Sequence, residues 1–366
     1  MFHVRRLTVA PTLKPPAQRN FIGLLCLLAV LTACSSNPLN PLASAPRTIE
    51  PARAAHAPPP SQNPAGAVRP LAGRPLAAVF DSGTRQLAVL CPGSEPSASA
   101  SIAVFGAALV PPRVIDLPAN ATALTGDDHG TIYLVVRGGY LMVHLAANDA
   151  EVTEQVRVAD AANTDFTAIA RRADGKLVVG SADGAVYTLA SSSPASLGTA
   201  TVDNRNKIFA RVDALVTQGN TTVVLDRGQT SVTTIGADGR VEQALRAGEG
   251  ATTLATDPEG RVLVADTRGG QLLVYGVDPL ILRQAYPVRQ APYGLAGSRD
   301  LAWISQTASN VVIGYDLSTG IPVEKVRYPT VQQPNTLAFD EVSDTLYVVS
   351  GSGAGIQVIG HAAGER

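Results

Sequence analysis

Short apolar runs separated by polar turns recur along most of this chain. In the best preserved example, Thr253–Tyr275, the apolar runs Val262–Ala265 and Leu272–Tyr275 are separated by Thr-Arg-Gly-Gly, and the first run follows Asp-Pro-Glu-Gly. β-Branched and aromatic residues favour strands, whereas Gly, Pro and Asp favour tight turns. The stretch therefore predicts two short strands, a polar tight turn and a third strand.

This unit recurs about seven times. Its first strand is marked by an apolar residue that returns every 39 to 46 residues: Val79, Leu124, Ile169, Leu215, Leu254, Leu295 and Leu337. Fourth strands are visible in five units, at Arg113–Leu117, Glu154–Val158, Val241–Leu245, Leu282–Tyr286 and Pro322–Tyr328. Four strands per period of about 40 to 45 residues are typical of β-propeller blades. We therefore expect an all-β, seven-bladed β-propeller over residues 74–360, with six or eight blades, and then a pair of β-sandwiches, as alternatives.

The last unit shows only three strands before the tail at residues 361–366. An unpaired sheet edge there would be open to association with other chains. The segment Ala67–Leu71 precedes the first unit and contains Pro70, which is tolerated only on an edge strand. We therefore expect this N-terminal segment to supply the missing outer strand and close the ring.

The first 33 residues have the proportions of a signal peptide. A basic stretch ends at Arg19 and is followed by the apolar run Phe21–Leu31, which is too short to span a bilayer. The next residues, Leu31-Thr32-Ala33-Cys34, resemble a bacterial lipobox. This resemblance implies that Cys34 is lipidated, as by palmitate, and that the protein is anchored at the cell membrane facing outside the cytoplasm.

A proline-rich segment connects Cys34 to the predicted propeller. Nine prolines occur between Ser35 and Gly73, without a periodic apolar pattern. Such segments favour extended, solvated polyproline II. We therefore expect residues 34–73 to be a disordered tether that lifts the propeller off the membrane.

The charge composition limits the classes of partner that the protein can bind. Removal of the residues up to Ala33 leaves 25 basic and 30 acidic residues. Nucleic-acid binding relies on clustered Lys and Arg, so this balance argues against that class. With Cys34 modified, Cys91 has no partner cysteine, and we expect it to be buried as a small apolar residue. The membrane is then reached through the lipid anchor, and we expect a monomer.

Two stretches carry a family resemblance. Asp257–Thr267 followed by Gln271–Tyr275 resembles an NHL repeat, and Tyr315–Gly320 with Val323 resembles the strand-turn-strand of YVTN-type propellers. The layout of lipobox, proline-rich tether and seven degenerate blades is similar to conserved mycobacterial and other actinobacterial propeller lipoproteins. The resemblance implies the architecture, and it implies no activity, because propellers host many functions.

In a propeller, the connections between blades and the loops between second and third strands gather at one mouth of the central channel, where ligands bind by default. These loops supply carboxylates, arginines and amides that suit a polar ligand. The candidate binding residues are Asn120, Arg137, Asp165, Arg211, Asp213, Asp226, Asp266, Tyr293, Gln306 and Asn335, with Arg227 and Arg268 in the same loops. Asp and Asn also cap turns in such loops, and this is the competing interpretation of each.

Catalysis has weaker support. Six-bladed relatives hold calcium with Glu, Asn and Asp, and Asp165, Asp213 and Asn335 are the available ligands, without a glutamate among them. The sequence Asp127-Asp128-His129 is expected in a turn on the opposite face. No catalytic residue, no metal site and no cofactor is indicated, with calcium left open.

We therefore expect a non-catalytic binding or scaffold module for a protein, peptide or envelope glycan, with no nucleic-acid partner. Two alternatives remain open from the sequence. One is a calcium-assisted lactonase or hydrolase of the NHL or gluconolactonase-like type, and the other is an assembly factor for envelope proteins.

Overall fold

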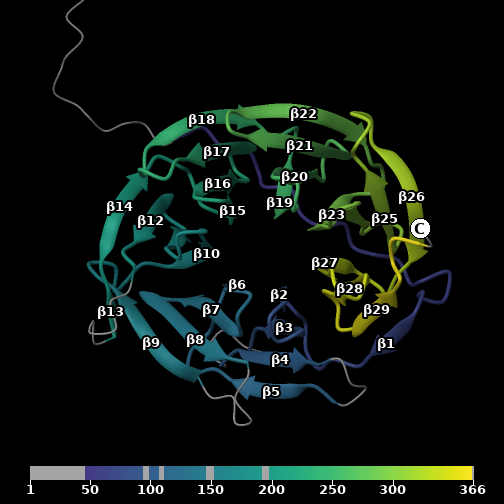
Figure 1. The fold of residues 1–366 in the computed structure, drawn as a ribbon, viewed down its shortest axis with the longest axis horizontal. Coiled ribbons are helices and arrows are strands. Elements are labelled where there is room, and N and C mark those ends of the chain that lie inside the picture. The colour runs from purple at the N-terminus through teal and green to yellow at the C-terminus, as the bar shows by residue number, and fades with distance from the viewer. Residues whose placement is uncertain (1–45, 94–98, 107–110, 146–151, 192–197, 365–366) are drawn as a thin grey trace, which may run out of the picture. The chain divides into compact units, whose positions relative to one another are not determined.

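Seven β-sheets make up the part of the chain that the computed structural model describes, which is residues 46–93, 99–106, 111–145, 152–191 and 198–364. No helix occurs in these residues, all of which belong to one compact unit beginning at Pro46. The sheets form a ring in which the first strand of each blade lies innermost and the last lies at the rim (Figure 1). The predicted seven-bladed β-propeller is confirmed.

Each blade is a meander whose strands pair in chain order. The first three blades are β2 (Ala77–Asp81), β3 (Gln86–Cys91), β4 (Ser101–Phe105) and β5 (Arg113–Asp116); β6 (Ala123–Gly126), β7 (Thr131–Val136), β8 (Gly139–His144) and β9 (Val152–Val158); and β10 (Phe166–Arg171), β11 (Leu177–Ser181), β12 (Ala185–Leu189) and β14 (Val202–Lys207). The two-residue strand β13 (Thr199–Ala200) adds to the second sheet by pairing in parallel with β9.

The remaining four blades complete the ring. They are β15 (Ala214–Gln218), β16 (Thr221–Asp226), β17 (Ser231–Ile235) and β18 (Val241–Arg246); β19 (Ala251–Thr256), β20 (Arg261–Asp266), β21 (Gln271–Val277) and β22 (Leu280–Pro287); β23 (Pro292–Gly297), β24 (Ala302–Gln306), β25 (Val311–Asp316) and β26 (Val323–Pro329); and β27 (Pro334–Asp340), β28 (Thr345–Ser350), β29 (Ile356–Gly360) and the N-terminal β1 (Ala67–Arg69).

The middle strands of each blade are buried on both faces, and the outer strands are half exposed. Every residue of β11 and β12 is buried, which explains why such strands read as continuous apolar runs. The outer strand β14 alternates between intermediate and exposed positions over the sequence Val-Asp-Asn-Arg-Asn-Lys. Its low apolar content is the reason that the sequence pattern did not reveal a fourth strand in the third blade.

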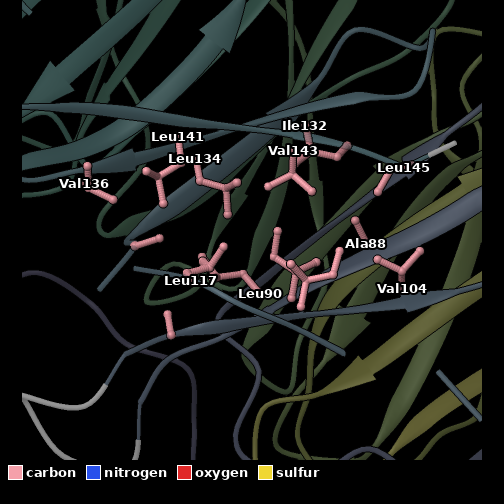
Figure 2. Close-up of a cluster of buried hydrophobic side chains, with 14 residues drawn as sticks. Ala88, Leu90, Val104, Leu117, Ile132, Leu134, Val136, Leu141, Val143 and Leu145 are labelled. Atoms are coloured by element: carbon pink, nitrogen blue, oxygen red, sulfur yellow. The ribbon is translucent and has the colours of Figure 1, made fainter. Parts of the chain in front are cut away.

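Apolar clusters lie between neighbouring blades, so that each sheet packs face to face on the next. Figure 2 shows the cluster between the first and second blades, where Leu90 and Val104 lie across from Leu134, Leu141 and Val143. The cluster that joins the last blade to the first includes Cys91, which is 5% exposed and, as expected, buried. Burial raises the pKa of this thiol.

Side-chain hydroxyls connect the inner strands of successive blades. Thr122 donates to Phe166 O (2.7 Å), and Thr217 donates to Arg171 O (2.7 Å). Ser305, in the second strand β24, donates to Pro334 O (2.5 Å) at the start of the next inner strand, β27. Because these bonds satisfy carbonyls next to the channel, they fix the spacing of the blades where the ring is narrowest.

The ring closes where β1 pairs antiparallel with β29, in the register Ala67↔Val358 and Arg69↔Ile356. The prediction that the N-terminal segment supplies the outer strand of the last blade is therefore confirmed. The wholly buried amide of Gln357 ties this closure together. It donates to Ala65 O (2.7 Å) and Pro329 O (3.0 Å) and accepts from Val331 N (3.0 Å).

An ion pair joins the turn between β2 and β3 in the first blade to the end of β27 in the last blade. Arg85 Nη2 lies 2.9 Å from Asp340 Oδ2, whose side chain is 3% exposed. Burial raises the pKa of Asp340, but hydrogen bonds from Ser343 and Val342 N and the charge of Arg85 outweigh it, so the pKa lies below its usual value. The aspartate is therefore ionised in the folded ring at neutral pH.

Several predictions about the N-terminus fall outside the described residues. These include the apolar run 21–31, the lipidation at Cys34 and the first part of the tether. Within the described residues there is no helix of the length and apolar character needed to cross a membrane.

Replacing Gln357 with Leu keeps the volume and removes all three hydrogen bonds, so that the buried Val331 N and the partly buried Ala65 O lose this partner. We expect the free energy of unfolding to fall by about 1–3 kcal/mol, measured as a lower midpoint in urea. The matched control is Gln155→Leu on the exposed face of the outer strand β9, which should change stability little. Equal midpoints for the two variants would contradict the role of Gln357 in closure.

Candidate functional site

Residues 46–66, here called the N-terminal strap, lie along one face of the ring without regular secondary structure. In Figure 1 the purple trace runs past the blades of β19–β22 and β23–β26 before it reaches β1. The strap bonds to loops of three successive blades: Ile49 N to Gly228 O (2.8 Å), Arg268 Nη2 to Glu50 O (2.7 Å) and Ala55 N to Thr307 Oγ1 (3.1 Å). The sequence predicts that residues 34–73 are a disordered tether. Residues 46–66 of that range contact the propeller through their backbone.

Polyproline-type chain has no internal hydrogen bonds, so its backbone groups need outside partners when it packs against protein. The amide of Gln333 provides two of them, because its Nε2 donates to Ala55 O (2.8 Å) and its Oε1 accepts from Ala57 N (2.9 Å). Next to it, Asn310 donates to Pro58 O (2.7 Å). Ala57 is 1% exposed, so the strap is seated in the face rather than lying loosely on it.

A cavity of about 700 Å³ lies between the strap and the ring. The ring residues come from loops that connect blades and from loops that join second to third strands, and they belong to blades on opposite sides of the ring. The cavity therefore lies at the mouth of the channel. Its lining residues are Pro51, Arg53, Ala54, Ala55, His56, Arg74, Arg211, Asp213, Arg227, Tyr293, Gln333, Asn335, Gly351 and Ser352.

The lining is rich in guanidinium groups. It contains four arginines, Arg53, Arg74, Arg211 and Arg227, and one carboxylate, Asp213. That carboxylate is engaged on both oxygens, because Arg211 Nε donates to Oδ1 (3.1 Å) and Arg227 N donates to Oδ2 (2.9 Å). Arg227 also donates from its side chain to Ala52 O in the strap. The cavity therefore carries an excess of positive charge.

The structure brings together four of the ten residues that the sequence proposed for binding. Arg211, Asp213, Tyr293 and Asn335 all line the cavity, and Arg227 joins them. They reach it from the loop before β15, the loop between β16 and β17, the start of β23 and the start of β27.

Asp226 and Asp266 are buried and act within the loops rather than at the cavity, since both are 0% exposed. Asp226 accepts from Ala210 N (2.7 Å) and Gln229 N (3.0 Å). Asp266 accepts in the same way from Gly250 N (2.8 Å) and from two other backbone amides. Each carboxylate thus holds the loop between two blades against the loop between second and third strands, the capping role that Asp often takes.

The other proposed residues lie away from the cavity lining. Gln306 is 6% exposed and donates to Arg289 O (2.8 Å), which again ties one loop to another. Arg137 and Asp165 form an exposed ion pair at 3.4 Å, with 64% of each side chain accessible. Asn120 is exposed in the loop before β6.

Sequence reasoning missed the strap's contribution, Arg53 and His56, as well as Arg74 and Gln333. The strap's prolines predict a solvated chain without contacts to the ring. One signal was present: residues 34–46 contain no charged side chain, whereas Arg47, Glu50, Arg53 and His56 follow within ten positions. A tether that only needs to be soluble has no reason to concentrate its charges in this way.

The three candidate calcium ligands, Asp165, Asp213 and Asn335, do not lie together. Asp213 and Asn335 share the cavity, but Asp165 does not line it. Within the residues that the structure describes, no group of three or more His, Cys, Asp or Glu side chains is arranged to hold a metal ion. Asp127 lies in the β6–β7 turn, as expected, and accepts from His129 N (2.8 Å) and Thr131 N (2.9 Å). Burial raises the pKa of Asp127, but these bonds outweigh it and lower the pKa.

Comparison with known proteins supports the fold. No family model and no curated protein matches the sequence. A chain in the structure described as "Crystal Structure of Mitotic Checkpoint Complex" is similar with a TM-score of 0.62 and 11% identity, covering 86% of this chain and 95% of that one. A streptogramin B lyase structure is similar with a TM-score of 0.60 and 10% identity, covering 80% and 95%. At such low identity the likeness shows the β-propeller fold alone.

Replacing Gln333 with Leu removes both bonds that this side chain makes with the strap. We expect the amide of Ala57 to exchange with deuterium faster, because it loses its acceptor. The control is Gln218→Leu, whose amide donates to Asp257 O and Arg261 O (both 3.0 Å) at a different part of the ring. Unchanged exchange at Ala57 in Gln333→Leu would show that the strap is held by other contacts.

Proposed function

We propose that this chain is a lipid-anchored, extracytoplasmic β-propeller that acts as a non-catalytic binding module, with the mouth cavity as its ligand site. The observation that carries the proposal is the cavity of about 700 Å³ built jointly by the strap and blades on opposite sides of the ring. Pockets of this size hold small ligands or the ends of polymer chains. The anchor rests on the lipobox-like sequence that ends at Cys34.

The chemistry of the lining supports binding over turnover. Guanidinium groups stay protonated at any physiological pH and donate hydrogen bonds without giving up protons. The one carboxylate of the lining, Asp213, is already occupied by Arg211 and by the backbone of Arg227. These groups are suited to recognise a ligand through charge and hydrogen bonds, which supports the binding role.

A calcium-assisted hydrolase is the second candidate, favoured by the presence of Asp213 and Asn335 in the same cavity. Calcium binding to the folded state would raise the melting temperature through mass action. A calcium-dependent increase that EDTA reverses, and that Asp213→Asn abolishes, would favour this candidate over the binding module.

Membrane attachment is tested at the predicted lipidation site. We expect Cys34→Ser, expressed as the full chain in a bacterial host that acylates lipoproteins, to lose acylation and to leave the membrane fraction. Cys26→Ser, in the apolar run that precedes the lipobox, is the matched control and should remain acylated and membrane-bound. Retention of Cys34→Ser in the acylated membrane fraction would overturn the anchor.

Binding at the mouth is tested by filling it. Ser352 is exposed and lines the cavity, so Ser352→Trp places an indole in the mouth at little cost to the fold. We expect the wild-type protein to retain a component of envelope extracts and to release it chemically unchanged, and we expect Ser352→Trp to lose it. Ser318→Trp, at an exposed turn between β25 and β26, is the control and should bind as the wild type does. Chemical conversion of the component would contradict a non-catalytic role.

A further inference from the structure

The mouth cavity is positive although the protein as a whole is acidic. Beyond Ala33 the chain has 25 basic and 30 acidic residues, yet the cavity lining contains four arginines and one aspartate. Like charges gathered in one cavity repel one another, and the repulsion is relieved when an anion binds between them. The charge distribution therefore favours an anionic occupant.

Two of the four arginines are free to contact a ligand. In the part of the chain that the structure describes, neither Arg53 nor Arg74 has a hydrogen-bond or ion-pair partner, and both are exposed. They come from different segments, since Arg53 lies in the strap and Arg74 between β1 and β2. A guanidinium presents a planar set of donors that matches carboxylate or phosphate in a bidentate arrangement.

The rest of the lining suits a sugar. Tyr293 is half-buried and offers an aromatic ring and a phenol, and Asn335 offers amide donors that no described residue uses. An aromatic surface beside a few uncharged hydrogen-bonding groups is a common way to orient a small polar ligand. An acidic peptide would satisfy the arginines equally well, but it would make less use of this second set of groups.

From these observations we propose that the mouth cavity binds an anionic glycan, a sugar chain that carries carboxylate or phosphate groups, and that the strap forms part of the site through Arg53. This proposal rests on the proposed function and specifies its ligand class. It also gives the strap a second role: it leads the chain to β1 and it completes the site.

The test measures binding of three probes to the purified full chain by calorimetry: trigalacturonate, neutral maltotriose and a triglutamate peptide. We expect trigalacturonate to bind most tightly and to weaken as salt is added, because exposed charge pairs are screened. We expect Arg53→Gln and Arg74→Gln each to weaken it by about tenfold, the effect of losing one charged hydrogen-bonding partner.

Two matched controls remove an arginine elsewhere. Arg47→Gln changes the same strap outside the cavity lining, and Arg240→Gln changes a side chain that is 86% exposed on a turn between β17 and β18. Both should bind trigalacturonate as the wild type does. If Arg47→Gln weakened binding as much as Arg53→Gln, the effect would be one of general charge and the assigned site would be wrong.

Three results would overturn the proposal: no binding of trigalacturonate, equal binding of maltotriose, or tighter binding of triglutamate. These results are distinguishable from failure of the proposed function. If the envelope component is still retained by the wild type and lost by Ser352→Trp, the binding module stands and only the ligand class is wrong. If retention fails as well, both proposals fall.

Discussion

The pairing of β1 with β29 is the constraint on which the rest of this structure depends. Seven blades packed face to face leave an edge on the last sheet, and a segment from the far end of the sequence must fill it. Gly66 makes the entry possible, because its φ is +70° and a Cβ there would lie 2.2 Å from Val358 O. The buried amide of Gln357 then fixes the carbonyl of Ala65. Once β1 is in place, the residues before it must leave from this point on the ring.

The closure of the ring and the mouth cavity therefore depend on the same N-terminal segment. The strap starts beside Gly228, passes the loops of the next blades and ends at β1, so it is held at both ends and along its length. Its few apolar contacts come from small side chains such as Ala57, and its backbone bonds to side-chain amides. A segment fixed by polar contacts is positioned accurately without a core of its own. The guanidinium of Arg53 is thereby presented to the same cavity as the ring residues.

The spacing of apolar residues was sufficient to predict the fold, because each anchor, from Val79 to Leu337, lies in the inner strand of a blade. The sequence pattern did not predict the outer strand β14, because its exposed position allows polar residues along most of its length. The site was harder to predict. Asp213 and Asp226 look alike in the sequence, and what separates them is that Asp226 is fully buried under backbone donors whereas Asp213 faces the cavity. The strap's role depends on bonds to Asn310 and Gln333, distant residues that a local pattern does not reveal.

The positive cavity has a consequence for the energetics of the ring. Four guanidinium groups around one space repel each other in the absence of a ligand, and the half-exposed Arg211, paired with the largely buried Asp213, offsets only part of this cost. The fold tolerates this repulsion because hydrogen bonds to a buried carboxylate hold the loops that carry Arg211 and Arg227. Asp226, buried and accepting from Ala210 N and Arg211 N, holds one of these loops whether or not the cavity is filled. Asp226 thus has a structural role: it holds the loop of Arg211, whose guanidinium pairs with Asp213, while the guanidinium groups of Arg53 and Arg74, unpaired among the described residues, enter the cavity from other segments.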